Sequence, residues 1–156
     1  MMGANIRPAQ TEEATILSDI AIRSKAYWGY DPEYMECAKK DLSISEENIL
    51  DNWIFVIEAE NTIRGFYELR ENSKQEAELF WLFVDPTSIG AGYGKKLMKH
   101  AIQLAMNNNF IHIRIKSDPN AEGFYKGFGA IVVGESPSTV RPDMKLPVMS
   151  LRITQV

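Results

Sequence analysis

The stretch VDPTSIGAGYGKKL, residues 84–97, decides how this chain folds around its site. An apolar run, Leu79 to Val84, stops at Asp85 and Pro86; three glycines follow at alternate positions, and an amphipathic pattern then begins. This order predicts a strand, a glycine-rich turn and a helix N-terminus. Backbone N–H groups in such a turn converge on a phosphate, because glycine has no Cβ to block the approach, and the helix start adds a partial positive charge. The stretch therefore predicts a site for a phosphorylated ligand.

The spacing of these glycines excludes two common nucleotide loops. A P-loop needs four residues between its first glycine and Gly-Lys, followed by Ser or Thr. Here three residues separate Gly90 from Gly94, and Lys96 stands at the hydroxyl position. A dinucleotide-binding fold needs G-x-G-x-x-G and a later acidic residue. The chain has G-x-G-x-G, and the corresponding later segment, residues 111–116, contains no acid.

Three segments of the chain resemble the GNAT N-acetyltransferases, which bind acetyl-coenzyme A (acetyl-CoA). The glycine-rich stretch is similar to the V-x-P-x-x-[Q/R]-G-x-G-x-[G/A] loop of that family. Residues 121–130, AEGFYKGFGA, resemble the family's N-x-x-A-x-x-F-Y-x-x-x-G-F segment, and residues 146–149, LPVM, resemble its closing strand. The resemblance covers roughly residues 54–153 and is less specific in the N-terminal third.

This resemblance implies an α+β fold, a mixed α/β sandwich with a central mixed sheet of about six to seven strands flanked by helices. It further implies that two parallel middle strands splay apart and leave a wedge for acetyl-CoA. The residue pattern itself predicts strands over residues 4–8, 54–59, 63–71, 77–84, 111–116, 130–135 and 146–153. It predicts helices that begin near Thr11, Asp31 and Ser45, and helices over residues 92–107 and 119–127. We expect one N-acetyltransferase domain over residues 1–156.

The family's loop and the strand before it also imply a set of coenzyme-binding residues. The pantetheine amides are expected to pair with the end of the central strand, and the pyrophosphate with the loop. The predicted residues are Leu82, Phe83, Val84, Ile89, Gly90, Ala91, Gly92, Tyr93, Gly94, Lys95, Asn120 and Tyr125. Two departures from the family pattern bear on coenzyme affinity: Ile89 replaces the usual Gln or Arg, and Asp118 stands where Asn is usual. Ala130 replaces the usual Phe as a packing change.

Two side chains are candidates for proton transfer. Glu78 lies six residues before Val84, where histone-type members of the family place a catalytic glutamate, and apolar neighbours would raise its pKa toward that of a general base. The alternative is a solvated carboxylate near a strand start. Tyr125 matches the family's Phe-Tyr tyrosine, and its phenol suits a general acid for a departing thiolate; the alternative is a core aromatic residue. Cys37 is interpreted as a packing residue rather than a nucleophile.

The segment between the first two predicted helices is the candidate acceptor site. In the family this segment lines the acceptor groove, and here it contains Tyr27, Trp28 and Tyr30. Residues 31–60 carry nine acids and two lysines, a balance that suits a cationic amine. The alternative is that the acids form solvated helix faces and the aromatic residues belong to the core. The loop over residues 136–145 is expected to cover the groove, with Arg141 near the acceptor or a coenzyme phosphate.

The composition is that of an ordinary globular domain. Of 156 residues, 45% are hydrophobic and 24% charged, and the formal net charge of −4 argues against general nucleic-acid binding. The sequence has no apolar run of membrane-spanning length, and its single cysteine excludes an internal disulfide, so we expect a cytoplasmic protein. His100 is expected on a helix surface. Since neither histidine has a partner at ligand spacing, no metal is expected.

These features predict an acetyl-CoA-dependent N-acetyltransferase that acts on a primary amine of a small molecule or peptide, by direct attack in a ternary complex. An acyltransferase with a different acyl group or a non-amine acceptor is an alternative. A catalytically inactive CoA-binding or protein-interaction module is another, and Ile89 and Asp118 are the residues that favour it. The adjacent aromatic residues and the C-terminal strand are also candidate homodimer contacts.

Overall fold

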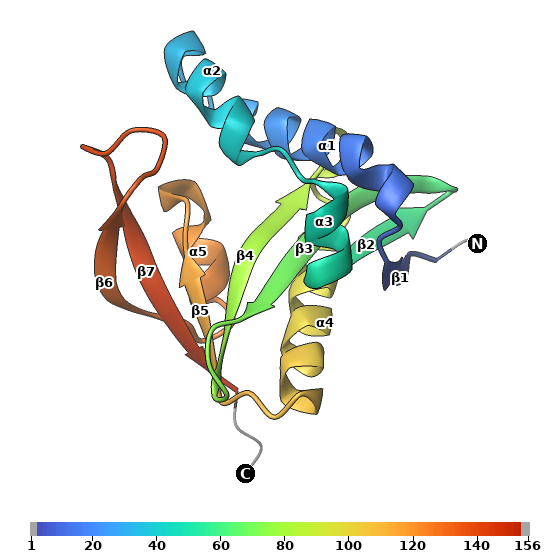
Figure 1. The fold of residues 1–156 in the computed structure, drawn as a ribbon, viewed down its shortest axis with the longest axis vertical. Coiled ribbons are helices and arrows are strands. Elements are labelled where there is room, and N and C mark those ends of the chain that lie inside the picture. The colour runs from blue at the N-terminus through green and yellow to red at the C-terminus, as the bar shows by residue number, and fades with distance from the viewer. Residues whose placement is uncertain (1–2, 154–156) are drawn as a thin grey trace.

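A seven-stranded mixed sheet with helices on both faces forms the centre of the computed structural model, which describes residues 3–153 (Figure 1). The strand order is β1-β2-β3-β4-β5-β7-β6, with β4 and β5 parallel and every other neighbouring pair antiparallel. The strands are β1 (Asn5–Pro8), β2 (Trp53–Ala59), β3 (Thr62–Glu71), β4 (Glu76–Val84), β5 (His112–Lys116), β6 (Ile131–Pro137) and β7 (Lys145–Arg152). The predicted mixed α+β sandwich of six to seven strands is confirmed.

The helices follow the start signals in the sequence. Asp31 caps α2 by accepting a hydrogen bond from the Tyr34 backbone N–H at 2.7 Å, and Ser45 caps α3 in the same way through Asn48. The helical elements are η1 (Thr11–Glu13), α1 (Ala14–Ala26), α2 (Pro32–Asp41), α3 (Glu46–Asp51), η2 (Pro86–Ser88), α4 (Tyr93–Asn107), η3 (Pro119–Ala121) and α5 (Glu122–Lys126). The helix predicted over residues 119–127 is thus a 3₁₀ turn followed by α5. Within residues 3–153, every helix is too short or too polar to cross a membrane.

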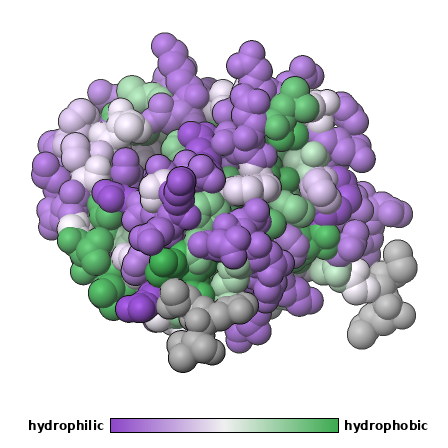
Figure 2. Space-filling view, turned by 60° about the horizontal axis from the view of Figure 1, so that its bottom comes forward, coloured by the Kyte–Doolittle hydropathy of each residue, from purple (hydrophilic) through white to green (hydrophobic). Residues whose placement is uncertain are grey.

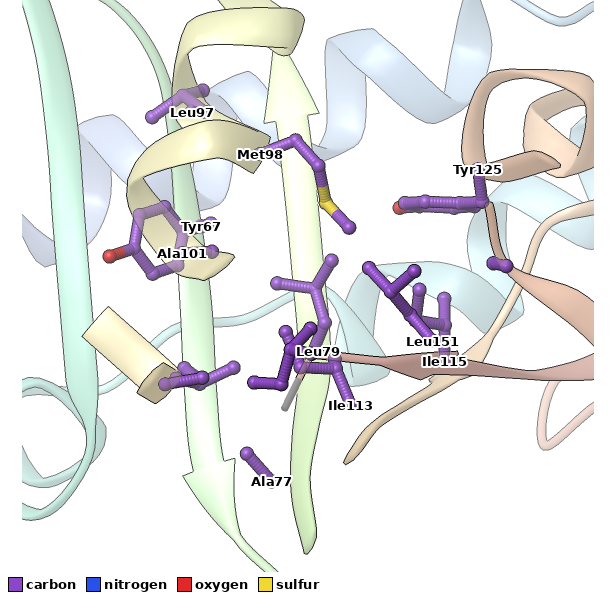
Figure 3. Packing of buried hydrophobic residues seen from close by; sticks show 14 of the residues in the cluster. Tyr67, Ala77, Leu79, Leu97, Met98, Ala101, Ile113, Ile115, Tyr125 and Leu151 are labelled. Atoms are coloured by element: carbon purple, nitrogen blue, oxygen red, sulfur yellow. The ribbon is translucent and has the colours of Figure 1, made fainter. Parts of the chain in front are cut away.

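Two hydrophobic clusters, one on each face of the sheet, hold the layers together. The first contains Leu97 and Met98 of α4, and we name it the α4-side cluster (Figure 3). The second contains Leu17 of α1, and we name it the α1-side cluster. Because successive strand residues point to opposite faces, neighbours on β3 divide between the two: Phe66 joins the α1-side cluster and Tyr67 the α4-side cluster. A residue's cluster therefore tells which face of the sheet it lies on.

Two side chains lie where the sequence did not place them. His100 is half-buried rather than on the helix surface: its Nδ1 lies 2.7 Å from the Tyr67 hydroxyl, and its ring centroid lies 4.7 Å from that of Phe55. The reason is helical spacing, since His100 follows the fully buried Leu97 by three residues and so lies along the same face. Burial lowers the pKa of His100 below its ordinary value of 6.5. Cys37 is exposed on α2, so its interpretation as a packing residue is wrong.

β6 forms one edge of the sheet and exposes apolar side chains. Ile131, Val132 and Val133 are 64, 44 and 58% exposed. Figure 2 shows a largely hydrophilic surface with a hydrophobic patch at its left, the side on which β6 lies in Figure 1. A homodimer contact at the C-terminal strands stays a prediction.

Candidate active site

β4 and β5 pair along part of their length and then separate. Their parallel register joins Glu76–Leu79 to His112–Ile115, while β4 runs on to Val84 paired only with β3. Phe80 lies between two successive register pairs of β4 with β3 and has no partner of its own. An extra residue of this kind is a β-bulge, which bends its strand. The strands splay as the resemblance implies, and the bulge lies at Phe80, just before the predicted segment 82–84.

A cavity of about 390 Å³ lies where the strands separate. Part of its wall belongs to the α4-side cluster, with Leu82 and Tyr125, and part to the α1-side cluster, with Tyr34 and Trp81. The cavity therefore passes through the gap between β4 and β5 and has a compartment on each face of the sheet. We name these the α4-side and α1-side compartments.

The glycine-rich loop leads from β4 into α4 beside the α4-side compartment. Gly90 and Gly92 have φ angles of +96° and +81°, a conformation that other residues rarely adopt, and no further heavy atom lies within 4 Å of where a Cβ would stand. The first backbone N–H groups of α4, from Tyr93 onward, have no intrahelical acceptor. Lys95 and Lys96 are exposed in the same turn. The loop thus offers open backbone donors and positive charge, which fit a pyrophosphate.

The predicted coenzyme-binding residues divide between the cavity wall and this loop. Those that line the cavity are Leu82, Phe83, Val84, Ile89, Gly94, Asn120 and Tyr125. Those of the loop that lie outside the lining are Gly90, Ala91, Gly92, Tyr93 and Lys95. A ligand that contacts both sets needs an anionic end at the loop and a narrower end in the cavity.

Tyr125 projects from α5 into the α4-side compartment. It is 6% exposed, and Figure 3 shows its ring directed toward Met98 of α4. Burial raises the pKa of the phenol, and the nearby negative charge of Asp118 raises it further. The hydroxyl therefore keeps its proton at neutral pH and is available as a donor.

Glu78 lies just outside the cavity. It is half-buried in the paired part of β4, one residue before Leu79, which lines the wall, but Glu78 itself does not. Its Oε1 accepts a hydrogen bond from Asn72 Nδ2 at 3.2 Å. Glu76, the neighbouring acid on the same strand, accepts from the same amide at 3.2 Å. Glu78 is therefore held by Asn72, and it adjoins the cavity through its neighbour Leu79.

Asp118, just after β5, ties that strand to the end of α1 and to the segment that follows α1. Its Oδ2 accepts from Lys25 Nζ at 2.5 Å and from the Tyr30 hydroxyl at 2.7 Å, and its Oδ1 accepts from the backbone and side-chain N–H groups of Asn120, both at 2.9 Å. Burial acts to raise the pKa of Asp118, but the charge of Lys25 and these hydrogen bonds hold it below the ordinary value of 3.8. Asp118 is therefore an ionised, satisfied carboxylate. Tyr30 positions it and does not line the cavity.

The chain is similar to acetyltransferases along most of its length. The profile of the Acetyltransferase (GNAT) family matches residues 20–130. The chain belongs to the GNAT acetyltransferase family. The 5-NmdU N-acetyltransferase of Pseudomonas phage PaMx11 is 31% identical over 132 residues, which cover 84% of this chain and 89% of that protein.

Solved structures of acetyltransferases share the fold. The paia N-acetyltransferase from Thermoplasma acidophilum, in complex with coenzyme A, has a TM-score of 0.80 at 22% identity over 97% of this chain and 99% of its own. A GNAT family acetyltransferase from Elizabethkingia anophelis with acetyl-CoA bound has a TM-score of 0.69 at 15% identity over 96% and 97% of the two chains. These likenesses show that this chain has the fold of the GNAT acetyltransferases.

The lining of the acetyltransferase cavity contains some residues that the sequence pointed to and some that it did not. Tyr27 and Trp28, which were predicted to bind the acceptor, line the cavity. Lys25, Asp41 and Lys116 line it too, although no motif includes them. The one available signal was that Lys25 lies two residues before Tyr27. Sequence spacing could not show that α2 and the end of β5 meet at the same cavity.

The loop between β6 and β7 closes the α1-side compartment of the acetyltransferase. Arg141 donates to both oxygens of Asp31, at 2.8 and 3.0 Å, and its guanidinium carbon lies 5.2 Å from the Tyr34 ring centroid. Thr139 donates to Asp41 at the end of α2. The loop thus covers the α1-side compartment, while Arg141 itself lies beside α2 and outside the cavity lining. Its position near the acceptor or a coenzyme phosphate stays a prediction.

Proposed function

We propose that this acetyltransferase transfers the acetyl group of acetyl-CoA to a primary amine of a small molecule or peptide, by direct attack in a ternary complex. The observation that carries the proposal is the cavity that reaches both faces of the sheet through the gap between β4 and β5. The glycine-rich loop adjoins one compartment, and the exposed Tyr27 and Trp28 adjoin the other. Each substrate can therefore bind from its own face, and both can be present at once.

The residues of the α4-side compartment fit acetyl-CoA. The loop from Ile89 to Lys95 would hold the pyrophosphate through backbone N–H groups at the start of α4. The backbone of residues 82–84, which β5 leaves unpaired, would bind the pantetheine amides. Bound acetyl-CoA supplies a thioester: an N–C bond forms as the C–S bond breaks, and the proton lost by the amine is balanced by one gained at sulfur.

The side chains near the gap would move these protons. An amine with a pKa near 10.4 is neutral in only about one molecule in 10³ to 10⁴ at pH 7, so a base assists the reaction. Glu78 would take the amine proton through water, because it lies outside the wall. Tyr125 would give its phenolic proton to the departing thiolate. A backbone N–H freed from the ladder at the Phe80 bulge could stabilise the developing oxyanion by about 3 kcal/mol.

Calorimetric titration with acetyl-CoA, followed by mass spectrometry of amines incubated with enzyme and acetyl-CoA, tests the proposal. We expect one-to-one micromolar binding and a mass gain of one acetyl group on an amine. Binding without transfer to any amine would favour the inactive CoA-binding module. Transfer only from a longer acyl-CoA, or only to a hydroxyl, would favour the other acyltransferase alternative.

Replacement of Tyr125 by Phe tests the general acid. We expect kcat to fall by about ten- to a hundredfold while the Kd for acetyl-CoA stays within about twofold, since only the proton donor is lost. Tyr67→Phe is the matched control, because Tyr67 is also buried but its hydroxyl contacts His100 instead of the cavity. An unchanged maximal rate in Tyr125→Phe would remove Tyr125 from the mechanism.

One named acceptor belongs in the panel of amines. The phage relative is named for 5-NmdU, and it is similar over most of this chain. We propose 5-NmdU as a specific candidate acceptor, to be compared with a lysine-containing peptide at equal concentration. Faster acetylation of 5-NmdU would support a shared acceptor, and acetylation of the peptide alone would refute it.

A further inference from the structure

The α1-side compartment is walled by aromatic rings from three parts of the chain. Trp81 and Phe83 of β4 stack with ring centroids 5.3 Å apart. Tyr34 comes from α2, and Tyr27 and Trp28 follow the end of α1 with their rings edge to face at 5.3 Å. All five side chains line the cavity. Ring faces therefore make up much of what an acceptor would meet.

Two of these rings are open to solvent. Among residues 3–153, Tyr27 and Trp28 are the exposed aromatic side chains, at 55 and 48%. Exposure of a ring surface to water is unfavourable, so binding of a flat apolar partner that covers the ring lowers the free energy. Such a partner also loses little conformational freedom, because a ring is rigid. The exposure of this pair at the cavity favours a ligand that contains a ring.

Most polar side chains of the compartment are already engaged. Ser24 Oγ donates to the Val84 carbonyl at 2.9 Å, and Lys25 pairs with Asp118 at 2.5 Å. Ser138 Oγ accepts from backbone N–H groups of its own loop. These groups hold the wall together and leave few hydrogen bonds for a flexible polar ligand.

Two charged side chains of the lining have no ion pair within the described part of the chain, and they limit the charge of the acceptor. Asp41 is exposed and accepts one hydrogen bond from Thr139, so it can attract an ammonium group. Lys116 is also exposed, and it lies on the α1 side because its neighbour Ile115 belongs to the α4-side cluster. A second ammonium on the acceptor would meet this cation and be repelled. One amine is favoured over several.

We infer that the acceptor is a planar aromatic or heteroaromatic ring that carries a single primary amine. The ring lies against Trp28 and Trp81, and Asp41 attracts the ammonium group. The inference rests on the proposed function and deepens it, since it names the class of acceptor. Stacking on one aromatic side chain changes affinity by about tenfold or more, so the preference is measurable.

The experiment compares acceptors that differ in one property. 2-Phenylethylamine and 2-cyclohexylethylamine share a carbon skeleton but only the first has a flat aromatic ring, while spermidine is linear and carries several amines. We expect kcat/KM for 2-phenylethylamine to exceed that of the other two by about tenfold or more. Trp28→Leu should remove most of this advantage and leave the Kd for acetyl-CoA unchanged. Ile16→Ala, a change at an exposed apolar side chain of α1 outside the cavity, is the control.

A binding measurement separates this inference from the proposed function. Calorimetry of the same three amines, with free CoA present, needs no turnover. Equal affinities, tighter binding of spermidine, or no binding of 2-phenylethylamine would overturn the inference even if some other amine is acetylated. Tighter binding of 2-phenylethylamine without any acetyl transfer would support the inference and count against the proposed function.

Discussion

The two compartments of the cavity are built in different ways. The loop beside the α4-side compartment is one continuous stretch, residues 84–97, in which a capped turn, two left-handed glycines and a helix start follow one another. The α1-side compartment is held by contacts between distant residues: Lys25 with Asp118, and Arg141 with Asp31. The proposed coenzyme site thus depends on a local motif, whereas the proposed acceptor site is assembled from segments far apart in the chain.

Gly92→Glu should give the largest effect and separates the two compartments. A carboxylate about 4 Å from a phosphate costs about 4 kcal/mol at an effective dielectric constant near 20, which weakens acetyl-CoA binding about a thousandfold. Gly29→Glu is the matched control, because Gly29 has the same φ of +81° and equally open surroundings but lies between Trp28 and Tyr30. Calorimetry should show acetyl-CoA binding lost in the first variant and kept in the second. Equal losses would mean that backbone strain, not position, is responsible.

Glu78→Gln should lower kcat by about a hundredfold, or about 2.7 kcal/mol in the activation barrier, if Glu78 is the general base. Glu76→Gln is the control, since both carboxylates accept from Asn72 at 3.2 Å on the same strand. Initial rates at saturating acetyl-CoA measure the difference. If the two variants have the same rate, Glu78 is only a solvated carboxylate near the strand start.

The loop beside the α4-side compartment could be predicted from the sequence because its signals are local. The end of β4, the alternate glycines and the start of α4 are neighbours in the chain, so their spacing fixes their geometry. The same holds for the caps at Asp31 and Ser45. The prediction for His100 failed because this residue of α4 lies at the margin of the buried helix face, and its partner Tyr67 belongs to a distant element, β3.

The α1-side compartment could be predicted only in part. The family resemblance led to Tyr27 and Trp28, but Tyr30 contacts Asp118 instead of lining the cavity. Asp118 looked like the loss of a coenzyme contact, and the structure shows a carboxylate paired with Lys25, 93 residues away in the chain. No spacing rule connects such residues, because tertiary packing alone brings them together.

Lys25→Met tests whether the long-range contacts hold the α1-side compartment. Both side chains of the Lys25–Asp118 pair are 14% exposed, so removal of the cation leaves a mostly buried carboxylate with only neutral donors. We expect a loss of about 1–2 kcal/mol in the free energy of unfolding, measured with urea. Arg23→Met is the control on the same helix: Arg23 pairs with Asp85 but is 50% exposed, so its loss should cost under about 1 kcal/mol. Equal losses would contradict a special role for Lys25.

The smallest expected effect is that of pH. A fall in pH should destabilise the packing on the two sides of the sheet in different pH ranges. His100, against the α4-side cluster, has a pKa lowered by burial, so its contribution is complete above 6.5 and declines as the pH falls below that value. The contribution of Asp118 is present above pH 3.8 and is lost only as the pH falls below that value.

Between about pH 7.5 and 5.5 the free energy of unfolding of the wild type should therefore fall by up to about half a kcal/mol through His100, since solvent screens a half-exposed ring. Urea unfolding of His100→Gln should show a flatter pH dependence in this range than the wild type. If His100→Gln keeps the wild-type slope, the pH dependence of the α4 side arises from another group.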